Sequence, residues 1–316
     1  MKNKVLISAT LILQFAFGDL SSIPGAFTDV GYSAKSISMG LVQSNLENGA
    51  MGTILNPANL LNNKEAHSIA INSFKLGNLD NYLVLAYSTN LFENIPLGLM
   101  MISSGDDIWS ETQIGLSIGY SFLDGLNLGL TTKLFNVSAG NNSNGSLQIG
   151  DSGELQVSGS GMGFGLDFGV QYQATENQNF ALVFKNLLNK LSYSSAGGGG
   201  DAEGDYSESI PAQYTIGYNI SNESFSAHLD IFDGFGGENP TEFRMGTDWN
   251  LYREMLFVRT GFRMELMTGE NKMYGLGSGI NVNPGNIGLE LNLGYFFRPD
   301  FVDMNELRLE FGFNLK

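Results

Sequence analysis

The chain has 316 residues and a formal net charge of −16, with 16 Lys and Arg against 32 Asp and Glu. This acidic balance excludes nucleic acid as a partner, because phosphate binding needs clustered Lys and Arg. The absence of cysteine excludes disulfide scaffolds, thiolate metal sites and cysteine nucleophiles. Glycine is abundant at 41 and proline scarce at 7, which favours many strands joined by turns over a helical bundle.

The N-terminus predicts an export signal. Lys2 and Lys4 precede a mostly apolar run, Val5–Phe17, and the small residues Ala16 and Gly18 have the spacing that signal peptidase prefers. We expect cleavage after Gly18, so that residues 1–18 form a signal peptide. An N-terminal membrane anchor is the alternative, although the apolar run is shorter than the roughly 20 residues of a spanning helix.

Residues 19–64 show no sustained alternation of apolar and polar side chains. Short helix-like pieces are expected at Ser44–Gly52 and Pro57–Leu61. Asn56 before Pro57 is typical of a helix N-cap followed by the preferred first helical residue. The apolar content of this segment favours burial, and a loose periplasmic tail is the alternative.

From Ala66 onward, apolar and polar residues alternate. In the last segment Leu307, Leu309, Phe311 and Phe313 share one face, because side chains of a strand alternate with period two. The pattern recurs about fourteen times with about ten residues per crossing. We therefore predict an all-β fold, a single transmembrane antiparallel β-barrel of about 14 strands over residues 65–316.

Long and short connections alternate along the chain. If the mature N-terminus lies on the periplasmic side, the odd-numbered connections face outward and the even-numbered ones face inward. We expect long outward connections at Gly105–Ser110, Ala139–Ser158, Ser194–Ser209, Asp233–Asn239, Glu265–Gly269 and Pro299–Asp303. Most of the inward ones are short turns, such as Asn283–Gly285, and only the outward Leu76–Leu79 breaks the pattern. This segregation is typical of bacterial outer-membrane barrels. It predicts that the protein is exported to the outer membrane and contacts its lipid.

Charged residues are expected on the lumen face, because a lone charge facing lipid is costly. They carry both signs, so that many can pair across neighbouring strands. By alternation they are Lys133, Asp167, Asp230, Arg244, Asp248, Arg259, Arg263, Glu290, Arg308 and Glu310. Glycine is equally frequent on this face and is expected to leave volume inside the barrel. A barrel of this size is too wide for its own side chains to fill, so residues 19–64 are the expected hatch in the lumen.

No catalytic site is predicted. His67 and His228 both lie in strand patterns, and neither has a serine or acid partner at motif spacing. Trp109 is expected in a loop and Trp249 in a strand, where interface anchoring is the default role. The acidic residues of Ser194–Ser209 match no calcium-binding motif, and a solvated loop is the simpler interpretation. We expect no enzyme activity, no cofactor and no metal site.

The expected hatch carries a family resemblance. Its two stretches Gly31–Gly40 and Asn48–Leu60 resemble the N-terminal signature of FadL-like barrels, and most closely that of the PorV/PorQ branch. Asn59 stands where the family usually has Gly. The matching residues are Met39, Gly40, Asn56, Pro57, Ala58 and Leu60.

The resemblance implies a fourteen-stranded barrel with an N-terminal hatch, and it offers two functions. One is uptake of hydrophobic, fatty-acid-like small molecules through a plugged barrel. The other is a PorV/PorQ-like role as an outer-membrane component of type IX protein secretion, with secretion-system proteins as partners. The first predicts a kink or break in one strand near the hatch.

Overall fold

The computed structural model describes residues 26–27, 30–46, 49–76, 81–92, 95–106, 109–140, 158–196, 204–234, 241–299 and 305–316. The predicted signal peptide, residues 1–18, lies outside them. Within the described ranges, no helix has the length and apolar character needed to cross a bilayer.

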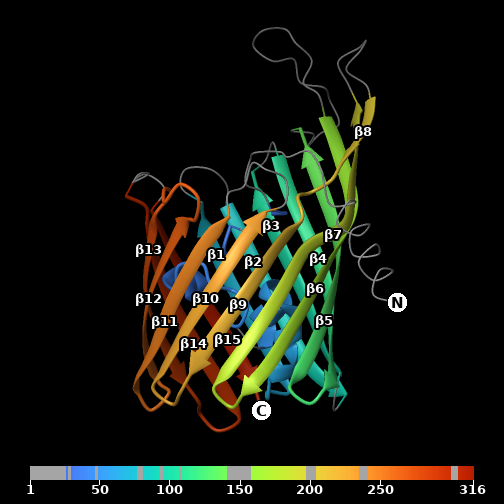
Figure 1. Ribbon diagram of the computed structural model, residues 1–316. Coiled ribbons are helices and arrows are strands. Elements are labelled where there is room, and N and C mark those ends of the chain that lie inside the picture. The colour runs from blue at the N-terminus through green and yellow to red at the C-terminus, as the bar shows by residue number, and fades with distance from the viewer. Residues whose placement is uncertain are drawn as a thin grey trace, which may run out of the picture.

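The described strands form one antiparallel sheet that closes on itself (Figure 1). They are β1 (His67–Lys75), β2 (Asn81–Phe92), β3 (Ile95–Gly105), β4 (Trp109–Leu123), β5 (Leu126–Ala139), β6 (Ser158–Thr175), β7 (Gln178–Ala196), β8 (Gly204–Glu208), β9 (Gln213–Ser221), β10 (Phe225–Gly234), β11 (Glu242–Tyr252), β12 (Leu256–Glu265), β13 (Met273–Val282), β14 (Ile287–Phe297) and β15 (Glu306–Leu315). Each pairs with the next along the ring, β15 pairs with β1, and β8 pairs only with β7. The remaining fourteen strands make the closed barrel, which confirms the predicted fold class.

Short turns connect the strands at one end of the barrel, the lower end in Figure 1. Asp124-Gly125 alone separates β4 from β5, and Gly125 has the positive φ of 75° that such a tight turn favours. At the opposite end β5 stops at Ala139 and β6 starts at Ser158. The expected long connection there falls mostly outside the described residues, as do those expected at Asp233–Asn239 and Pro299–Asp303.

Two local predictions are wrong. The outward loop expected over Ser194–Ser209 contains the end of β7 and all of β8, which pair from Leu191 to Ser195. Its low-complexity sequence lacks the alternation that would have marked a strand. Trp109, expected in a loop, is the first residue of β4 and pairs with Ala139.

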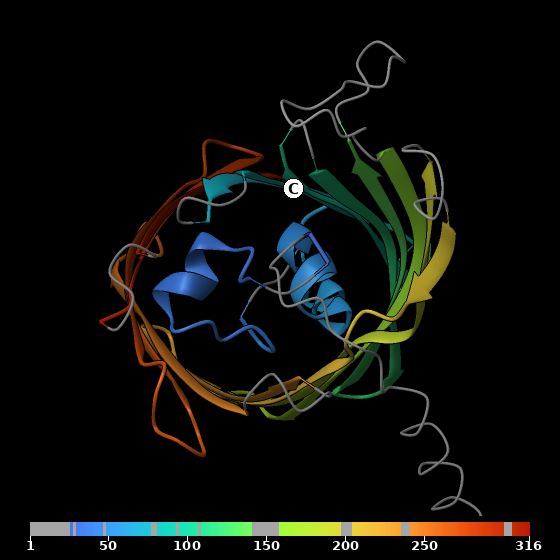
Figure 2. The same ribbon diagram turned by 90° about the horizontal axis from the view of Figure 1, so that it is seen from above.

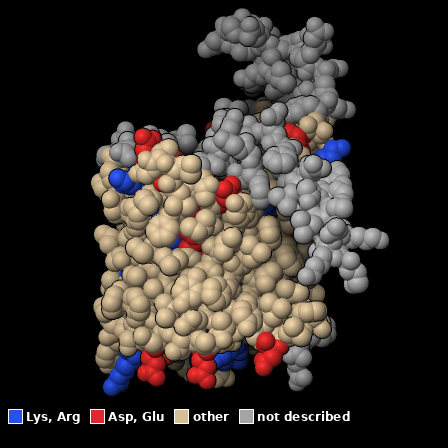
Figure 3. Space-filling view, in the orientation of Figure 1, with Lys and Arg blue, Asp and Glu red and all other residues tan. Residues whose placement is uncertain are grey.

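The oily face of the strands points outward. On β15, Phe311 is 53% exposed, whereas Arg308 on the opposite face is 1% exposed. The other strands repeat this arrangement, with rows of exposed Leu, Ile, Phe and Tyr around the barrel. On the side shown in Figure 3, charged residues gather along the lower rim, and the band above it is mostly uncharged.

Short helical segments lie inside the ring, as the view from above shows (Figure 2). They are α2 (Ala34–Ser38), η1 (Gly49–Met51), α3 (Gly52–Leu55) and η2 (Pro57–Asn62). We call the described part of residues 26–64 the hatch. The Ser33 hydroxyl caps α2 by accepting from the backbone N–H groups of Lys35 and Ser36.

The helical pieces expected from the sequence are found in part. η2 begins at Pro57, and the Asn56 side chain accepts from the N–H of Ala58 at 3.1 Å, as the cap pattern predicts. Of the described residues in the expected helical piece at Ser44–Gly52, those from Gly49 onward are helical and residues 44–46 form a turn. α2 was not predicted, because one and a half turns cannot establish a helical periodicity.

A candidate site between the hatch and a break in the barrel wall

Glycines of the lumen face receive the backbone of the hatch. A Cβ atom on Gly261 would lie 2.0 Å from the carbonyl carbon of Met39, and one on Gly129 would lie 2.2 Å from the amide nitrogen of Ala58. The same close approach to hatch backbone occurs at Gly246, Gly275 and Gly294. The expectation that these glycines leave free volume is therefore wrong, since the hatch occupies the space that side chains would take.

The hatch residues that match the family signature are buried, and they pack against the barrel wall and against one another. Gly40 has a φ of 70°, and a Cβ there would lie 2.5 Å from the backbone of Phe262. Met39 packs with Val42 and Leu46 in a small apolar cluster. At Gly246 and Gly261, therefore, no wall side chain lies between the strand backbone and the hatch.

The second signature stretch is held by polar contacts of the hatch with itself. The Nδ2 atoms of Asn56 and Asn59 donate to the carbonyl of Ser44 at 2.7 and 3.1 Å. Pro57 and Ala58 lie against Gly129, and Leu60 is fully buried. These contacts join the two halves of the hatch and position η2 across the lumen.

Several lumen-facing charges bind the backbone of the hatch. Asp230 accepts from the N–H groups of Gln43 and Ser44, and from the Ser44 hydroxyl. Glu310 accepts from the N–H of Ala34 at 2.9 Å. Hydrogen bonds to buried carboxylates are stronger than neutral ones, so these two strands hold the hatch firmly.

Two arginines act in the same way on carbonyl groups. The Nη1 atom of Arg244 donates to the carbonyl of Leu41, and the Nη2 atom of Arg308 donates to that of Val30, both at 3.1 Å. The predicted lumen charges on β10, β11 and β15 are thereby brought to one hatch segment, residues 30–44.

Two glutamates that were not among the predicted lumen charges complete the ion pairs of these arginines. Glu242 pairs with both Arg244 and Arg263, and Glu306 pairs with Arg308. Each glutamate lies two residues before an arginine on the same strand, so alternation was the signal that placed it on the lumen face. Among the predicted pairs across strands, Asp248 and Arg259 lie opposite each other with a contact of 3.0 Å.

Two further charged residues, Glu290 and Arg298, form hydrogen bonds with side chains of β15. Glu290 accepts from the Nδ2 atom of Asn314 at 2.7 Å. Arg298, which follows β14, donates to Glu306 at 3.0 Å. Burial lowers the pKa of the Arg298 guanidinium, and the Glu306 carboxylate counteracts that shift.

The upper lumen beside β1 to β7 contains a large buried apolar cluster, where a polar lumen face was predicted. Phe27 of the hatch packs against Phe135 of β5 with ring centroids 4.8 Å apart. This buried cluster extends over Tyr32, Ile54, Phe74, Tyr82, Val84, Met100, Ile102, Val137, Leu191 and Ile210. The sequence signal was the stretch of β2 that is apolar on both faces, since such a strand is buried on both sides.

The barrel wall is interrupted next to this cluster. β7 pairs with β9 only as far as Lys185 and resumes pairing with β8 at Leu191. Between these points Asn186 and Leu188 have positive φ values of 57° and 42°, which non-glycine residues rarely adopt. The register of β7 on β6 also shifts twice at the same level. This region, with the facing residues 209–212, is called the strand break below.

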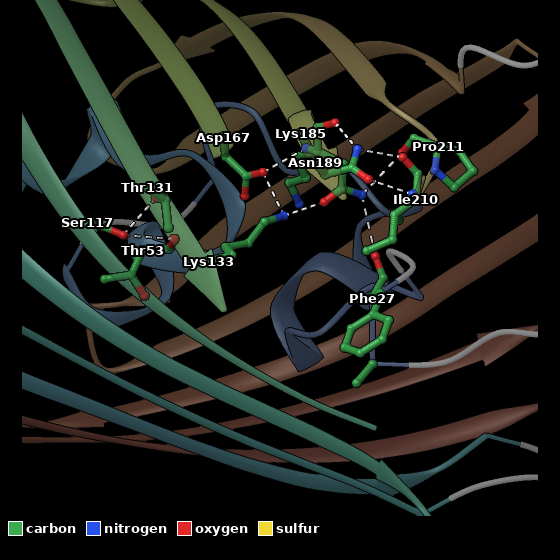
Figure 4. A network of polar contacts seen from close by, with 12 residues as sticks. Phe27, Thr53, Ser117, Thr131, Lys133, Asp167, Lys185, Asn189, Ile210 and Pro211 are labelled. Atoms are coloured by element: carbon green, nitrogen blue, oxygen red, sulfur yellow. Dashed lines mark hydrogen bonds and ion pairs between the residues drawn. The ribbon is translucent and has the colours of Figure 1, made fainter. Parts of the chain in front are cut away.

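Side chains replace the missing ladder at the strand break (Figure 4). The Nζ atom of Lys133 lies 2.6 Å from Asp167 and donates to the Asn186 side chain. Asn189 donates to the carbonyl of Ile210 at 2.8 Å and accepts from its N–H at 2.6 Å. Lys133 and Asp167 were predicted to face the lumen, whereas Asn186 and Asn189 carry no sequence signal, because asparagine is common in every loop and turn.

A small cavity of about 20 Å³ lies between the apolar cluster and the strand break. It is lined by Phe27, Tyr32, Ile54, Met100, Gln113, Lys133, Asp167, Lys185, Asn186 and Gln213. Apolar and polar walls thus meet at one point of the lumen, beside the interruption of β7. Within the described residues no cluster of His, Asp and Glu has the arrangement of a metal site.

Comparison with known proteins identifies the fold. No family model and no curated protein matches the sequence. The crystal structure of the Ralstonia pickettii toluene transporter TbuX is similar, with a TM-score of 0.62 and 14% identity over 90% of this chain and 98% of that one. The Pseudomonas putida toluene transporter TodX matches with a TM-score of 0.59 and 13% identity over 92% and 98% of the two chains.

A Pseudomonas aeruginosa FadL homologue matches with a TM-score of 0.57 and 12% identity, over 90% of this chain and 97% of that one. Identities this low establish the architecture and leave the substrate to be argued from the site. The chain therefore has the FadL-like fold, a fourteen-stranded antiparallel barrel closed around N-terminal helical segments.

Proposed function

We propose that this protein is a bacterial outer-membrane channel that passes hydrophobic, fatty-acid-like small molecules through its hatch-filled barrel. The observation that carries the proposal is the buried apolar cluster of the upper lumen. It extends from Phe74 on β1 to Leu191, where the pairing of β7 resumes, and to Ile210 within the strand break. An apolar lining that ends at an interruption of the barrel wall suits a hydrophobic solute that leaves the lumen through the wall and enters the membrane.

The outer face of the barrel supports a lipid environment. Leu309 and Phe311 of β15 and many similar side chains point outward, and burying them in hydrocarbon is favourable. The alternation of oily and wet faces, the segregated connections and the expected export signal agree with an outer-membrane location.

The hatch argues against a water-filled pore. Its backbone lies directly on wall glycines such as Gly129 and Gly261, and wall charges such as Asp230 and Arg244 bind it. A polar solute crossing the lumen along this path would have to displace these contacts. TbuX and TodX, to which the fold is similar, are described as toluene transporters, which agrees with a hydrophobic cargo.

The proposal is tested by uptake and by what co-purifies. Cells that express the protein should take up radiolabelled dodecanoate faster than cells that lack it, and native mass spectrometry of the detergent-purified protein should find lipid-like molecules. Unchanged uptake, an empty lumen and a stoichiometric protein partner would contradict the channel. That combination would instead favour the PorV/PorQ-like role in type IX secretion.

A further inference from the structure

The outer face of β5, β6 and β7 changes from apolar to polar at one level of the barrel wall. Leu134 and Phe164 are register partners that are 66% and 54% exposed, and Lys190 on β7 continues their row. The next two rows, toward the strand ends opposite the short turns, consist mostly of hydroxyl and amide side chains. They are Asn136, Met162, Ser192 and Ser207 in the first row, and Ser138, Ser160 and Ser194 in the second. Lys190 therefore lies where the lipid-facing belt of the barrel ends on this side.

An open recess with a volume of about 590 Å³ lies over these polar rows. Lys190, Met162, Tyr193 and serines of both rows line it. β7 and β8 rise above the neighbouring wall at this place (Figure 1). The volume falls within the range of sites that bind small molecules, and most of the lining side chains point away from the lumen. The recess is thus separate from the hatch and from the small cavity beside the strand break.

The ammonium group of Lys190 is the one charged group among the described residues that line the recess. No described residue forms a hydrogen bond or an ion pair with it. Glu208 on β8 is the register partner of the buried Leu191, so by alternation its carboxylate lies on the lumen side, where it accepts from the Tyr193 hydroxyl at 2.7 Å. An ammonium group without a carboxylate partner suits a phosphate, which lysine binds as a point charge.

We propose that this recess binds the headgroup of a phosphorylated, acylated sugar lipid in the outer leaflet of the membrane. Lys190 binds the phosphate, and the serine hydroxyls, which can both donate and accept, exchange hydrogen bonds with the sugar. The acyl chains lie along the apolar belt that begins at Met162 and Phe164. This site goes beyond the proposed channel, with which it shares only the outer-membrane location.

The surroundings of the recess favour this lipid over other ligands that carry a phosphate. Met162 is 72% exposed, and a soluble sugar phosphate would leave it in water, whereas an acyl chain covers it. A zwitterionic phospholipid would bring a second cation close to Lys190, which would repel it. A simple anionic phospholipid lacks the sugar ring that the two serine rows can bind.

The test compares three lipids: bisphosphorylated lipid A, the same lipid A after removal of its phosphates, and phosphatidylglycerol. Binding of each to the full-length protein in detergent is measured by native mass spectrometry. We expect bisphosphorylated lipid A to bind at least about fivefold more tightly than either of the others, which is the effect of one charge-assisted hydrogen bond. Lys190→Ala should abolish the preference for the phosphorylated form, and Lys190→Arg should retain it because the positive charge remains.

Lys272→Ala is the matched control, because Lys272 is an exposed lysine at the same end of the barrel, directly before β13. It should keep the preference of the wild type. An unchanged preference in Lys190→Ala would overturn the site, and so would equal binding of the three lipids to the wild type. Should Lys190→Ala fail to fold, the ranking of the three lipids on the wild-type protein still decides.

A soluble headgroup distinguishes a lipid site from a site for free sugar phosphate. Glucosamine 1-phosphate should bind the wild type far more weakly than bisphosphorylated lipid A, and equal binding of the two would overturn the lipid assignment. Uptake of dodecanoate by the wild type reports on the channel separately. Uptake without the lipid preference would overturn this inference alone, and the lipid preference without uptake would overturn the channel alone.

Discussion

The Oδ2 atom of Asp230, on the barrel wall, accepts a hydrogen bond of 2.7 Å from the backbone N–H of Gln43 in the hatch. The two residues are separated by 187 positions in sequence, so this contact joins the first part of the chain to the tenth strand. A carboxylate that serves two N–H groups and a hydroxyl fixes the hatch at this point.

Removal of this carboxylate should loosen the hatch. Asp230→Ala leaves the N–H groups of Gln43 and Ser44 buried without an acceptor, at a cost of about 3 kcal/mol in the free energy of unfolding. Asp230→Asn keeps one acceptor and should lie between the two. Thermal unfolding followed by circular dichroism measures the effect, and Asp124→Ala in the exposed turn after β4 is the control. Equal stability of Asp230→Ala and the control would show that the contact does not hold the hatch.

A side chain at Gly261 should displace the hatch without changing the outer face. Gly261→Val places two methyl groups where the Met39 backbone lies, and overpacking of this kind costs about 1–3 kcal/mol. We expect faster cleavage of the hatch by added protease and greater entry of small polar dyes into proteoliposomes. Thr260→Val, one residue away on the exposed face, should change neither quantity. A Gly261→Val protein with wild-type protease resistance would argue against direct backbone contact.

Locking the strand break should reduce transport. Leu166 and Leu187 are register partners between the two shifts of β6 and β7, and antiparallel partners lie within the distance that a disulfide spans. The chain has no other cysteine, so Leu166→Cys combined with Leu187→Cys forms a single, reversible link. We expect uptake of dodecanoate by proteoliposomes to fall when the link is oxidised and to recover on reduction.

The control for this lock is the pair Val170→Cys and Leu182→Cys, which joins the same strands where their ladder is regular. Its oxidation should leave uptake unchanged, because that part of the wall does not open. Loss of uptake in both disulfide pairs would point to a general effect of cross-linking, and loss in neither would place the route away from the strand break.

The Lys133–Asp167 pair should matter for stability through its burial. Lys133→Met leaves the carboxylate of Asp167 buried beside an apolar side chain, and the loss of one partner of a buried pair costs about 3–5 kcal/mol. Lys133→Met combined with Asp167→Leu removes both charges and should recover most of that loss. The free energies of unfolding in denaturant measure both changes. A double variant no more stable than the single one would mean that the Asn186 contacts, and not the charge, dominate.

The architecture could be predicted from the sequence because it depends on local patterns. Alternation such as Leu309, Phe311 and Phe313 determines which face of a strand meets lipid, since the period of two is a property of the extended backbone. Turn residues such as Gly125 separated the strands, and the Asn56-Pro57 pair marked the start of η2. These signals act over a few residues, so no knowledge of distant contacts is needed.

The site depended on contacts between distant parts of the chain. The alternation predicted that Asp230 and Arg244 face the lumen, but only the packed structure shows that they bind hatch backbone at Gln43 and Leu41. The glycines at positions such as 129 and 261 looked like free volume because the sequence does not show what lies opposite them. A break in some strand near the hatch was expected only from the family resemblance, and its position at residues 186–190 and 209–212 could not be read from the sequence, because it depends on the pairing that these residues lose.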